Sequence, residues 1–283
     1  MAVITLVGLP GAPGVTSTAM ALLRTWPLTQ GWRVVLAECD PDGGSILPGA
    51  LQGQLEADRG LRNLAISSRI GPQDLATAFW QQLFYVEADE RQAEGRRMLL
   101  AGLTDMGQAS SLAPVWPELA ELFGAIEDHR HDVLVDLGRN GAFGPAGVLA
   151  RRADLVLVVM RGTLRSLHMG RARMRHLRSV LEGDDGRGAS AHLEVVLIRE
   201  GPYGPREVEE AVGVPVIAQL PFRPDEAAVL SDGAGEGSKF MKSKLMSAAA
   251  VSTTAIRQRV AQRRTRLISP VQQRLQGVSH HAR

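Results

Sequence analysis

Short apolar runs that alternate with helical stretches constrain the fold of this chain more than any other feature. Several runs, such as LVLVVM at 155–160, are continuously apolar, with no polar residue at every second position. Such runs are typical of strands buried on both faces, as in a parallel sheet covered by helices. The expected strands are 3–7, 34–37, 83–86, 133–135, 155–160, 195–198 and 214–218.

Helical stretches separate these runs, at 16–24, 114–126, 164–181 and 205–212. Strand–helix alternation implies right-handed crossovers between parallel strands. We therefore predict a doubly wound α/β domain, with three layers and a predominantly parallel sheet of about seven strands. Residues 42–113 are less regular, with Gly and Pro punctuation, helical patches and one weak strand, and we interpret them as an elaboration within the domain.

The charged residues are distributed unevenly. The chain has 32 basic and 30 acidic residues, a net charge of +2, but residues 237–283 hold 10 Lys or Arg and no Asp or Glu. The first 236 residues therefore have 22 basic and 30 acidic residues, a net charge of −8. We predict an α/β domain at 1–236 and a basic C-terminal helix and tail at 237–283. All three lysines lie in the tail: Lys239, Lys242 and Lys244.

The tail follows DGAGEGS at 232–238, a linker by composition, and one helix is predicted from Lys239 to Ile268. We consider three interpretations: binding to an anionic membrane, binding to DNA phosphates, or packing on the acidic body or a second subunit. Apolar residues recur there at mostly helical spacing, with arginines between them: Ile256, Val260, Leu267, Val271 and Leu275, then Arg257, Arg259, Arg263, Arg264, Arg266 and Arg274.

Cysteine content and the N-terminus bear on the compartment. The only cysteine, Cys39, cannot form an intramolecular disulfide, which favours a reducing cytoplasm. The N-terminal apolar run is too short for a signal peptide or a membrane span. We expect a cytoplasmic protein, with the tail as a means of peripheral attachment at the membrane or the nucleoid.

The segment ITLVGLPGAPGVTSTAMALL reads as a strand, a Gly/Pro-rich turn and a helix, which is where a phosphate-binding loop would lie. In a P-loop, G-x-x-x-x-G-K-[ST], the lysine contacts the terminal phosphates and the hydroxyl binds Mg²⁺. Here Gly14-Val15-Thr16 stands in the G-K-T place, so the hydroxyl is kept and the cation is lost. Taken alone, the turn favours a tight strand–helix connection in which Thr16 caps the helix.

Carboxylates follow two of the predicted strands. Glu38 and Asp40 come at the end of VVLAECDPDGG, and Asp136 ends HDVLVDLGRNG. Carboxylates at the carboxyl ends of parallel strands line the crevice where such sheets bind ligands, and there they can hold Mg²⁺ or orient a water. The alternative is that Asp40 and Asp136 cap turns.

Together these motifs resemble the ParA/MinD family of deviant-Walker P-loop ATPases, which position DNA, division sites or secretion machinery. PGAPGVTSTA is similar to the family's KGGVGKTTTA turn, VVLAECDPDGG to its D-x-D-P-x-G strand end and DVLVDLGRN to its Walker B strand, and the likeness runs from residue 1 to about 235. The resemblance implies a homodimer that binds ATP and Mg²⁺. It implies catalysis by Asp40, metal binding by Thr16, Asp40 and Asp136, and nucleotide binding by Gly11, Gly14, Val15, Thr16 and Ser17.

The departures from the family are equally specific. Its two lysines would fall at Pro10 and Val15, and its base-recognising asparagine near Ile198 or Arg199. Because phosphoryl transfer depends on positioned positive charge, we expect a degenerate member with weak or absent ATP hydrolysis, as in the TadZ/CpaE-like branch. The alternative is an active ATPase in which an arginine replaces the lysine, and the candidates by position are Arg139, Arg161 and Arg199.

Overall fold

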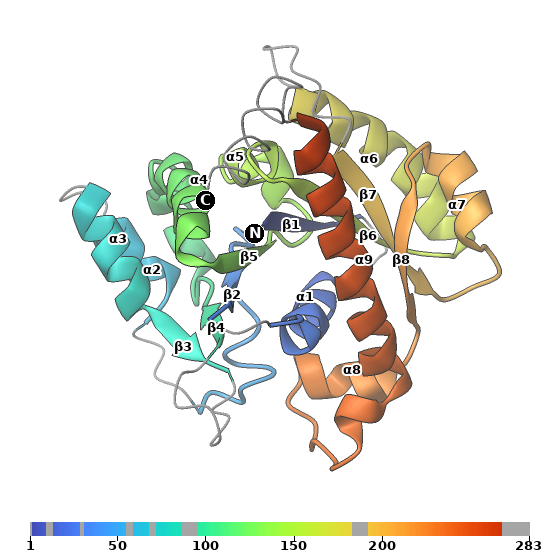
Figure 1. Cartoon of the computed structure of the whole chain (residues 1–283), viewed down its shortest axis with the longest axis horizontal. Helices are drawn as coiled ribbons and strands as arrows, with labels where there is room; N and C mark the ends of the chain where they lie inside the picture. Colours follow the sequence, from blue (N-terminus) through green and yellow to red (C-terminus); the bar gives the residue numbers. More distant parts are fainter. Residues whose placement is uncertain are drawn as a thin grey trace, which may run out of the picture.

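The computed structural model describes residues 2–9, 14–28, 31–54, 59–67, 72–86, 96–182 and 192–267. Within them, one eight-stranded sheet has the order β3-β4-β2-β5-β1-β6-β7-β8 (Figure 1). All neighbouring strands are parallel except β3, which pairs antiparallel with β4. The strands are β1 (Val3–Gly8), β2 (Arg33–Glu38), β3 (Leu83–Tyr85), β4 (Arg97–Leu100), β5 (His131–Asp136), β6 (Leu155–Arg161), β7 (Leu193–Arg199) and β8 (Val216–Pro221).

Helices cover both faces of the sheet, and alternate residues of each strand belong to different hydrophobic clusters. In β1, for example, Val3 and Val7 pack in one cluster, while Ile4 and Leu6 pack in the other. The first cluster is covered by α2 (Leu61–Ser67), α3 (Pro72–Gln81), α4 (Val115–Ala125), α5 (Gly147–Arg151), α6 (Leu164–Glu182) and α7 (Pro205–Val212). The second is covered by α1 (Val15–Thr25), α8 (Pro224–Ser231) and α9 (Lys244–Leu267).

The doubly wound, predominantly parallel fold is therefore confirmed, with two differences in detail. The expected strands are all present, although β8 begins at Val216 instead of residue 214. The strand β4 was not expected, because its four residues RMLL are too few for periodicity to distinguish a strand from a helix. It lies within the segment 42–113, between β2 and the antiparallel β3.

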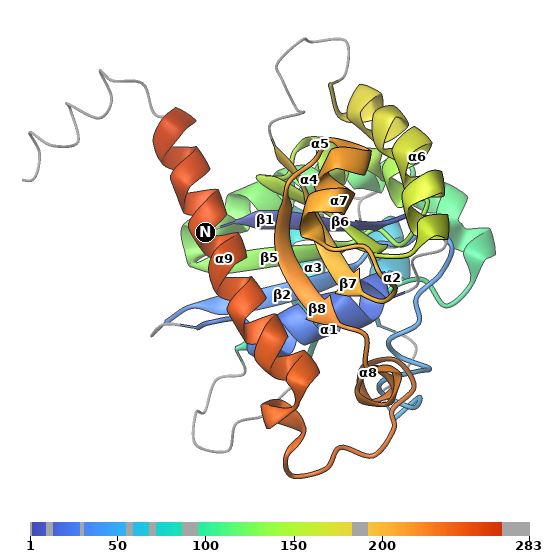
Figure 2. The ribbon, with the colours of Figure 1, turned by 90° about the vertical axis from the view of Figure 1, so that its right-hand side faces the viewer.

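The C-terminal helix differs slightly from its expected extent. A short 3-10 turn at Phe240–Lys242 precedes α9, and the extended backbone of Ser243 separates the two. Figure 2 shows α9 running along the molecule beside α1 and β8, the two elements that it contacts most. The buried side chains of Met246, Ile256 and Val260 join the second hydrophobic cluster.

The topology brings the predicted motifs to one edge of the sheet. β1 lies between β5 and β6, and β2 is the next neighbour of β5. Because these strands are parallel, the turn after β1, the loop after β2 and the loop after β5 emerge side by side. A backbone hydrogen bond of 2.8 Å from Gly8 N–H to the Gly138 carbonyl joins two of these loops.

Candidate functional site: a cavity at the carboxyl edge of the sheet

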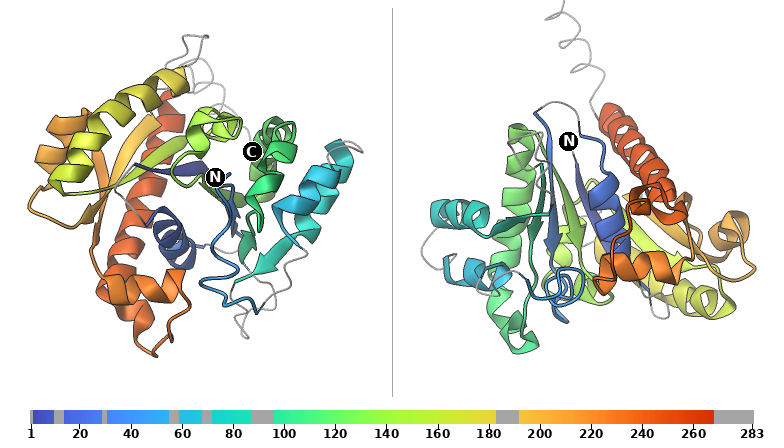
Figure 3. Two further views of the ribbon diagram at one scale, coloured as in Figure 1. Left: turned by 180° about the vertical axis from the view of Figure 1, so that it is seen from behind. Right: turned by 90° about the horizontal axis from the view of Figure 1, so that it is seen from below.

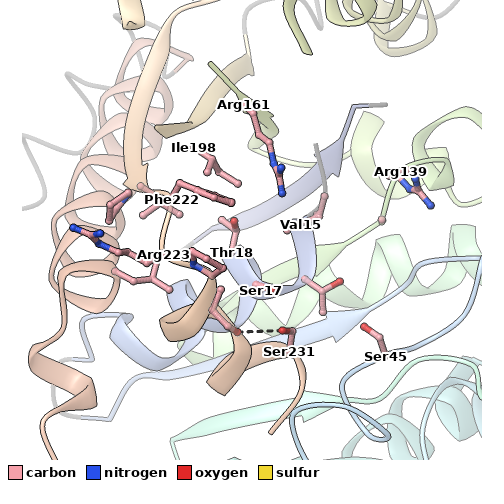
Figure 4. A pocket seen from close by; sticks show the side chains of 18 of the residues that line it. Val15, Ser17, Thr18, Ser45, Arg139, Arg161, Ile198, Phe222, Arg223 and Ser231 are labelled. Carbon is pink, nitrogen blue, oxygen red and sulfur yellow. Dashed lines mark hydrogen bonds between the residues drawn. The ribbon is translucent and has the colours of Figure 1, made fainter. Parts of the chain in front are cut away.

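A cavity of about 600 Å³ lies where the loops after β1, β2, β5, β6 and β8 meet the start of α1 (Figure 4). Its polar side is formed by hydroxyls of α1, by Asp40 and by arginines, and its apolar side by residues of β7, β8, α8 and α9. Of the predicted site residues, Gly14, Val15, Thr16, Ser17 and Asp40 line it. Gly11 and Pro10 lie outside the described residues, so the middle of the turn is not described.

The start of α1 is set by the conformation of Gly14 and the packing of Val15. Gly14 has φ +114°, a backbone conformation that an L side chain rarely adopts. The Val15 side chain is buried against the end of β1, since a Cβ added to Gly8 would lie 2.5 Å from Val15 Cγ2. The residue in the lysine place of the motif therefore fills space between α1 and β1 with an apolar group.

Asp136 is fully buried at the end of β5. Its Oδ1 accepts a hydrogen bond of 2.8 Å from Gly138 N–H, while Oδ2 has no hydrogen-bond partner among the described residues. Burial raises the pKa of Asp136 to about 6, against the opposing effects of the Thr16 side chain and Gly138 N–H. A buried carboxylate oxygen without a partner is costly, which makes it a ready ligand for a cation.

Asp40 lies at the same edge and is coupled to Asp136. Partial burial raises the pKa of Asp40 to about 6, the Asp136 and Asp42 carboxylates add to the shift, and Asp42 N–H and Arg139 oppose it. Its Oδ2 lies so close to Gly138 that a Cβ would not fit there, and Gly138 has φ +56°. The loop after β5 is thus shaped to admit the Asp40 carboxylate.

Glu38, the first acidic residue of that motif, has a structural role. Its Oε1 accepts hydrogen bonds from Ser45 and Ile46 N–H at 2.6 and 3.1 Å, and Oε2 accepts one from Gly102 at 3.0 Å. Burial raises the pKa of Glu38, and these backbone hydrogen bonds offset only part of that rise. Glu38 therefore holds the loops after β2 and β4 together.

Two of the three candidate arginines line the cavity. Figure 4 shows Arg161 extending from the end of β6 toward the first turn of α1, with Arg139 on the other side of Val15. Arg161 forms an ion pair of 2.6 Å with Glu200 and lies 5.2 Å from the centre of the Phe222 ring. Arg199 does not line the cavity and instead donates a hydrogen bond of 3.0 Å to Gln219.

The apolar side of the cavity contains Ile198, near the place of the family's base-recognising asparagine. Ile198, Leu220 and Phe222 lie at the ends of β7 and β8, opposite Thr18 of α1. This side offers a slot for a flat or apolar group with few hydrogen-bonding partners. Cys39, which follows β2, is fully buried in the other hydrophobic cluster, and burial together with Asp136 raises the pKa of its thiol well above the ordinary value, so it is no nucleophile.

A polar chain that the sequence did not suggest connects the site to α6. Arg173 of α6 donates to Asn140 Oδ1 at 3.0 Å, and Asn140 Nδ2 donates to Asp42 Oδ2 at 2.9 Å. Asp42 N–H in turn donates to Asp40 Oδ1 at 2.9 Å. Spacing gives no hint of this chain, because its members come from three elements.

The side chains fit Mg²⁺ better than they fit the phosphates of ATP. Thr16, Asp40 and the unpaired Oδ2 of Asp136 are oxygen ligands of the kind that Mg²⁺ takes together with water. The described residues contain no group of three His, Cys, Asp or Glu side chains that could hold a metal by itself. Phosphates would contact the hydroxyls of α1 and Arg161, and the place of the motif's lysine is occupied by Val15.

No helix in the described part of the chain is both long and apolar enough to cross a lipid bilayer.

Solved structures with this fold come from ParA and MinD proteins. A ParA family ATPase from Chlorobium tepidum TLS superposes with a TM-score of 0.67 at 14% identity, over 89% of this chain and 97% of that chain. MinD in the MinC:MinD cell division complex of Aquifex aeolicus superposes with a TM-score of 0.62 at 16% identity, over 90% of this chain and 95% of that chain. MinD with Mg-ADP from Pyrococcus horikoshii OT3 superposes with a TM-score of 0.56 at 15% identity, over 89% of this chain and 94% of that chain.

These identities establish the shared fold. No protein-family model matches the chain, and no curated protein sequence matches it significantly.

Proposed function

We propose that this protein is a degenerate member of the ParA/MinD family that positions a partner complex, with weak or no ATP hydrolysis. The observation that carries this proposal is the cavity itself. Thr16 and Asp40 line it, the buried Asp136 carboxyl ends β5 at the same edge of the sheet, and a buried valine stands where the phosphate-binding lysine would be. Loss of a positioned cation removes charge stabilisation of the phosphoryl-transfer transition state.

The assignment of individual residues follows the resemblance. Asp40 would orient an attacking water, and Mg²⁺ would be held by Thr16, Asp40 and Asp136. Gly11, Gly14, Val15, Thr16 and Ser17 would surround the phosphates. The neighbours support this reading, since one is a MinD bound to Mg-ADP and another is MinD in complex with MinC. We also propose a homodimer that acts on a secretion or pilus, division or DNA-partition complex, as in the TadZ/CpaE-like branch.

One observation favours the second candidate, an active Mg-ATP-dependent ATPase. Arg161 extends into the cavity toward the first turn of α1 and could supply the missing charge (Figure 4). Its ion pair with Glu200 opposes this role, because the guanidinium would have to leave a carboxylate at 2.6 Å. We therefore place the non-hydrolysing scaffold first.

Titration calorimetry with Mg²⁺–ATP, followed by a phosphate-release assay, tests the proposal. We expect weak or no binding heat and no release above background. Release that disappears in Asp40→Ala or Thr16→Ala would contradict the proposal and support the active ATPase. Loss of that release in Arg161→Gln, but not in Arg199→Gln, would identify the replacement cation.

Restoring the lysine gives the converse experiment. We expect Val15→Lys to increase ATP binding, because it returns a cation to the start of α1. Val15→Met is the matched control, since it has a similar length and no charge. Equal ATP binding by both variants would show that charge at residue 15 does not limit this site.

A further inference from the structure

The helix α6 has an unusual charge composition that the proposed site does not use. Its 19 residues contain five arginines and two histidines, and Glu182 at its end is the only acidic residue. Figure 3 shows α6 at the periphery of the molecule, and its buried side chains pack on one face of the sheet. At 1.5 Å per residue the helix presents an outer side about 28 Å long.

The apolar face of α6 fixes which residues point outward. Leu167, Met174 and Leu177 are buried in the first hydrophobic cluster. The helical repeat places the exposed residues of α6 in two rows. One row contains Leu164, His168, Arg171 and Arg175. The other contains Arg165, Met169, Ala172, His176 and Ser179.

The arginines of α6 fall into two groups by their contacts. Arg173 bonds to Asn140 and lies 3.6 Å from the centre of the Phe143 ring, and Arg178 donates to the Gly213 carbonyl, so these two hold α6 to the body. In contrast, Arg165, Arg171 and Arg175 have no ion pair, hydrogen bond or ring contact within the described part of the chain. None of the described residues neutralises their charges, which a partner could therefore pair with.

Two large apolar side chains are exposed among these free charges. Leu164 is 67% and Met169 47% exposed, at the N-terminal half of α6. Exposed apolar side chains surrounded by arginines are typical of protein–protein interfaces, where Met and Arg are enriched. We call the surface formed by Leu164, Arg165, His168, Met169, Arg171 and Arg175 the α6 face.

We propose that the α6 face docks an acidic protein segment that carries apolar side chains, such as an amphipathic helix with Asp or Glu beside Leu. The three guanidinium groups that have no partner in the described part of the chain would pair with carboxylates, while Leu164 and Met169 would be covered by the apolar side chains. The proposal deepens the proposed scaffold function, on which it rests, by naming the chemistry of a partner.

Other anionic partners fit this face less well. Insertion into a lipid surface needs a wide apolar face, and only two large apolar side chains are exposed here. Nucleic acid phosphates would pair with the arginines but would leave Leu164 and Met169 without an apolar contact.

The test measures binding of the full chain to a fluorescein-labelled helical peptide of about 20 residues, with Glu and Leu on one face and neutral polar residues elsewhere. We expect saturable binding that weakens about tenfold in Arg171→Glu/Arg175→Glu and, separately, in Leu164→Ser/Met169→Ser. Arg62→Glu/Arg206→Glu is the matched control, since both arginines are exposed elsewhere and the charge change is identical. A peptide with Gln for Glu should not bind.

Equal weakening by both arginine pairs would overturn the proposal, because binding would then follow net charge alone. No effect of Leu164→Ser/Met169→Ser would also overturn it. Tighter binding to a short DNA duplex, or to vesicles with phosphatidylserine, that depends on Arg171 and Arg175 would assign the face to a polyanion instead. Circular dichroism would check that each variant is folded. None of these variants touches the cavity, so the phosphate-release assay fails or succeeds independently of peptide binding.

Discussion

Two arginine-rich helices, α6 and α9, lie on opposite faces of the sheet and use their charges differently. In α9, Arg259 pairs with Glu194 at 2.8 Å, Arg264 makes two hydrogen bonds to Asp154, and Arg263 bonds to His192. In α6, Arg165, Arg171 and Arg175 have no partner in the described part of the molecule.

The comparison teaches that a count of charges does not identify a binding surface. The tail has the larger formal charge and was expected to be a candidate for lipid or DNA. The described part of α9 instead packs on the acidic body, as the third interpretation expected, with Ile256 and Val260 buried and Arg259 and Arg264 paired with body carboxylates. Residues 268–283 are not among those that the structure describes.

The largest expected effect tests whether α9 is part of the core. We expect Ile256→Asp, at a residue with no exposed surface, to lower the free energy of unfolding by about 4 kcal/mol, because it buries an unpaired carboxylate. Met169→Asp on α6 is the matched control, with a change within about 0.5 kcal/mol. Urea denaturation followed by tryptophan fluorescence measures both, and similar midpoints for the two variants would contradict the burial of α9.

The ion pair between α9 and β7 should have a smaller effect. We expect Arg259→Ala to lower the free energy of unfolding by about 1–2 kcal/mol, because Glu194 is buried and would lose its partner at 2.8 Å. Adding Glu194→Gln should recover part of this loss, since a neutral amide is less costly to bury. A full double-mutant cycle from urea denaturation gives the coupling, and a coupling of zero would mean that the pair contributes nothing.

A third effect concerns pH. Burial and the nearby Arg263 lower the pKa of His192 to about 4, so the native state resists a proton that the unfolded chain accepts near pH 6.5. The stability from neutral His192 is therefore present above pH 6.5 and is lost as the pH falls toward 4. We expect His192→Gln to reduce this loss by about 1 kcal/mol, since the ring is only partly buried and solvent screens its charge. Identical pH profiles of the free energy of unfolding would contradict this account.

The smallest effect is expected on the α6 face. Because Arg171 and Arg175 have no partners among the described residues, Arg171→Ala/Arg175→Ala should change the free energy of unfolding by less than about 0.5 kcal/mol. Thermal melting at low and high salt provides the measurement. A clear destabilisation would show that these arginines hold the fold, and it would remove the contrast with α9.

Much of the fold was accessible from the sequence because buried parallel strands leave continuous apolar runs, as LVLVVM does in β6. The missed strand β4 is short, and its pairing with β2 and β3 is a long-range property that periodicity does not carry. The cavity residues on the turn after β1 and on the strand ends were found by motif. Their assignment to nucleotide and Mg²⁺ stays a prediction, as does the division of the chain at residue 236.

Other site features could not be predicted. The anchoring of two loops by Glu38 depends on backbone N–H groups of Ser45, Ile46 and Gly102, which any residue offers. The chain from Asp40 through Asp42 and Asn140 to Arg173 joins residues more than a hundred positions apart. Nothing local in the sequence marks such partners.

The sequence by itself determined the strand–helix alternation, the absence of lysine from the first 238 residues and the concentration of positive charge at the C-terminus, since each is a property of composition or short-range order. Only the tertiary structure decided that Val15 packs on β1 and that Arg161 rather than Arg199 reaches the cavity. It also decided that Arg259 and Arg264 of α9 are paired, whereas three arginines of α6 have no partner among the described residues. The physical reason is that a side chain's charge is fixed by its type, whereas its partners and its exposure to solvent are fixed by what folding places beside it.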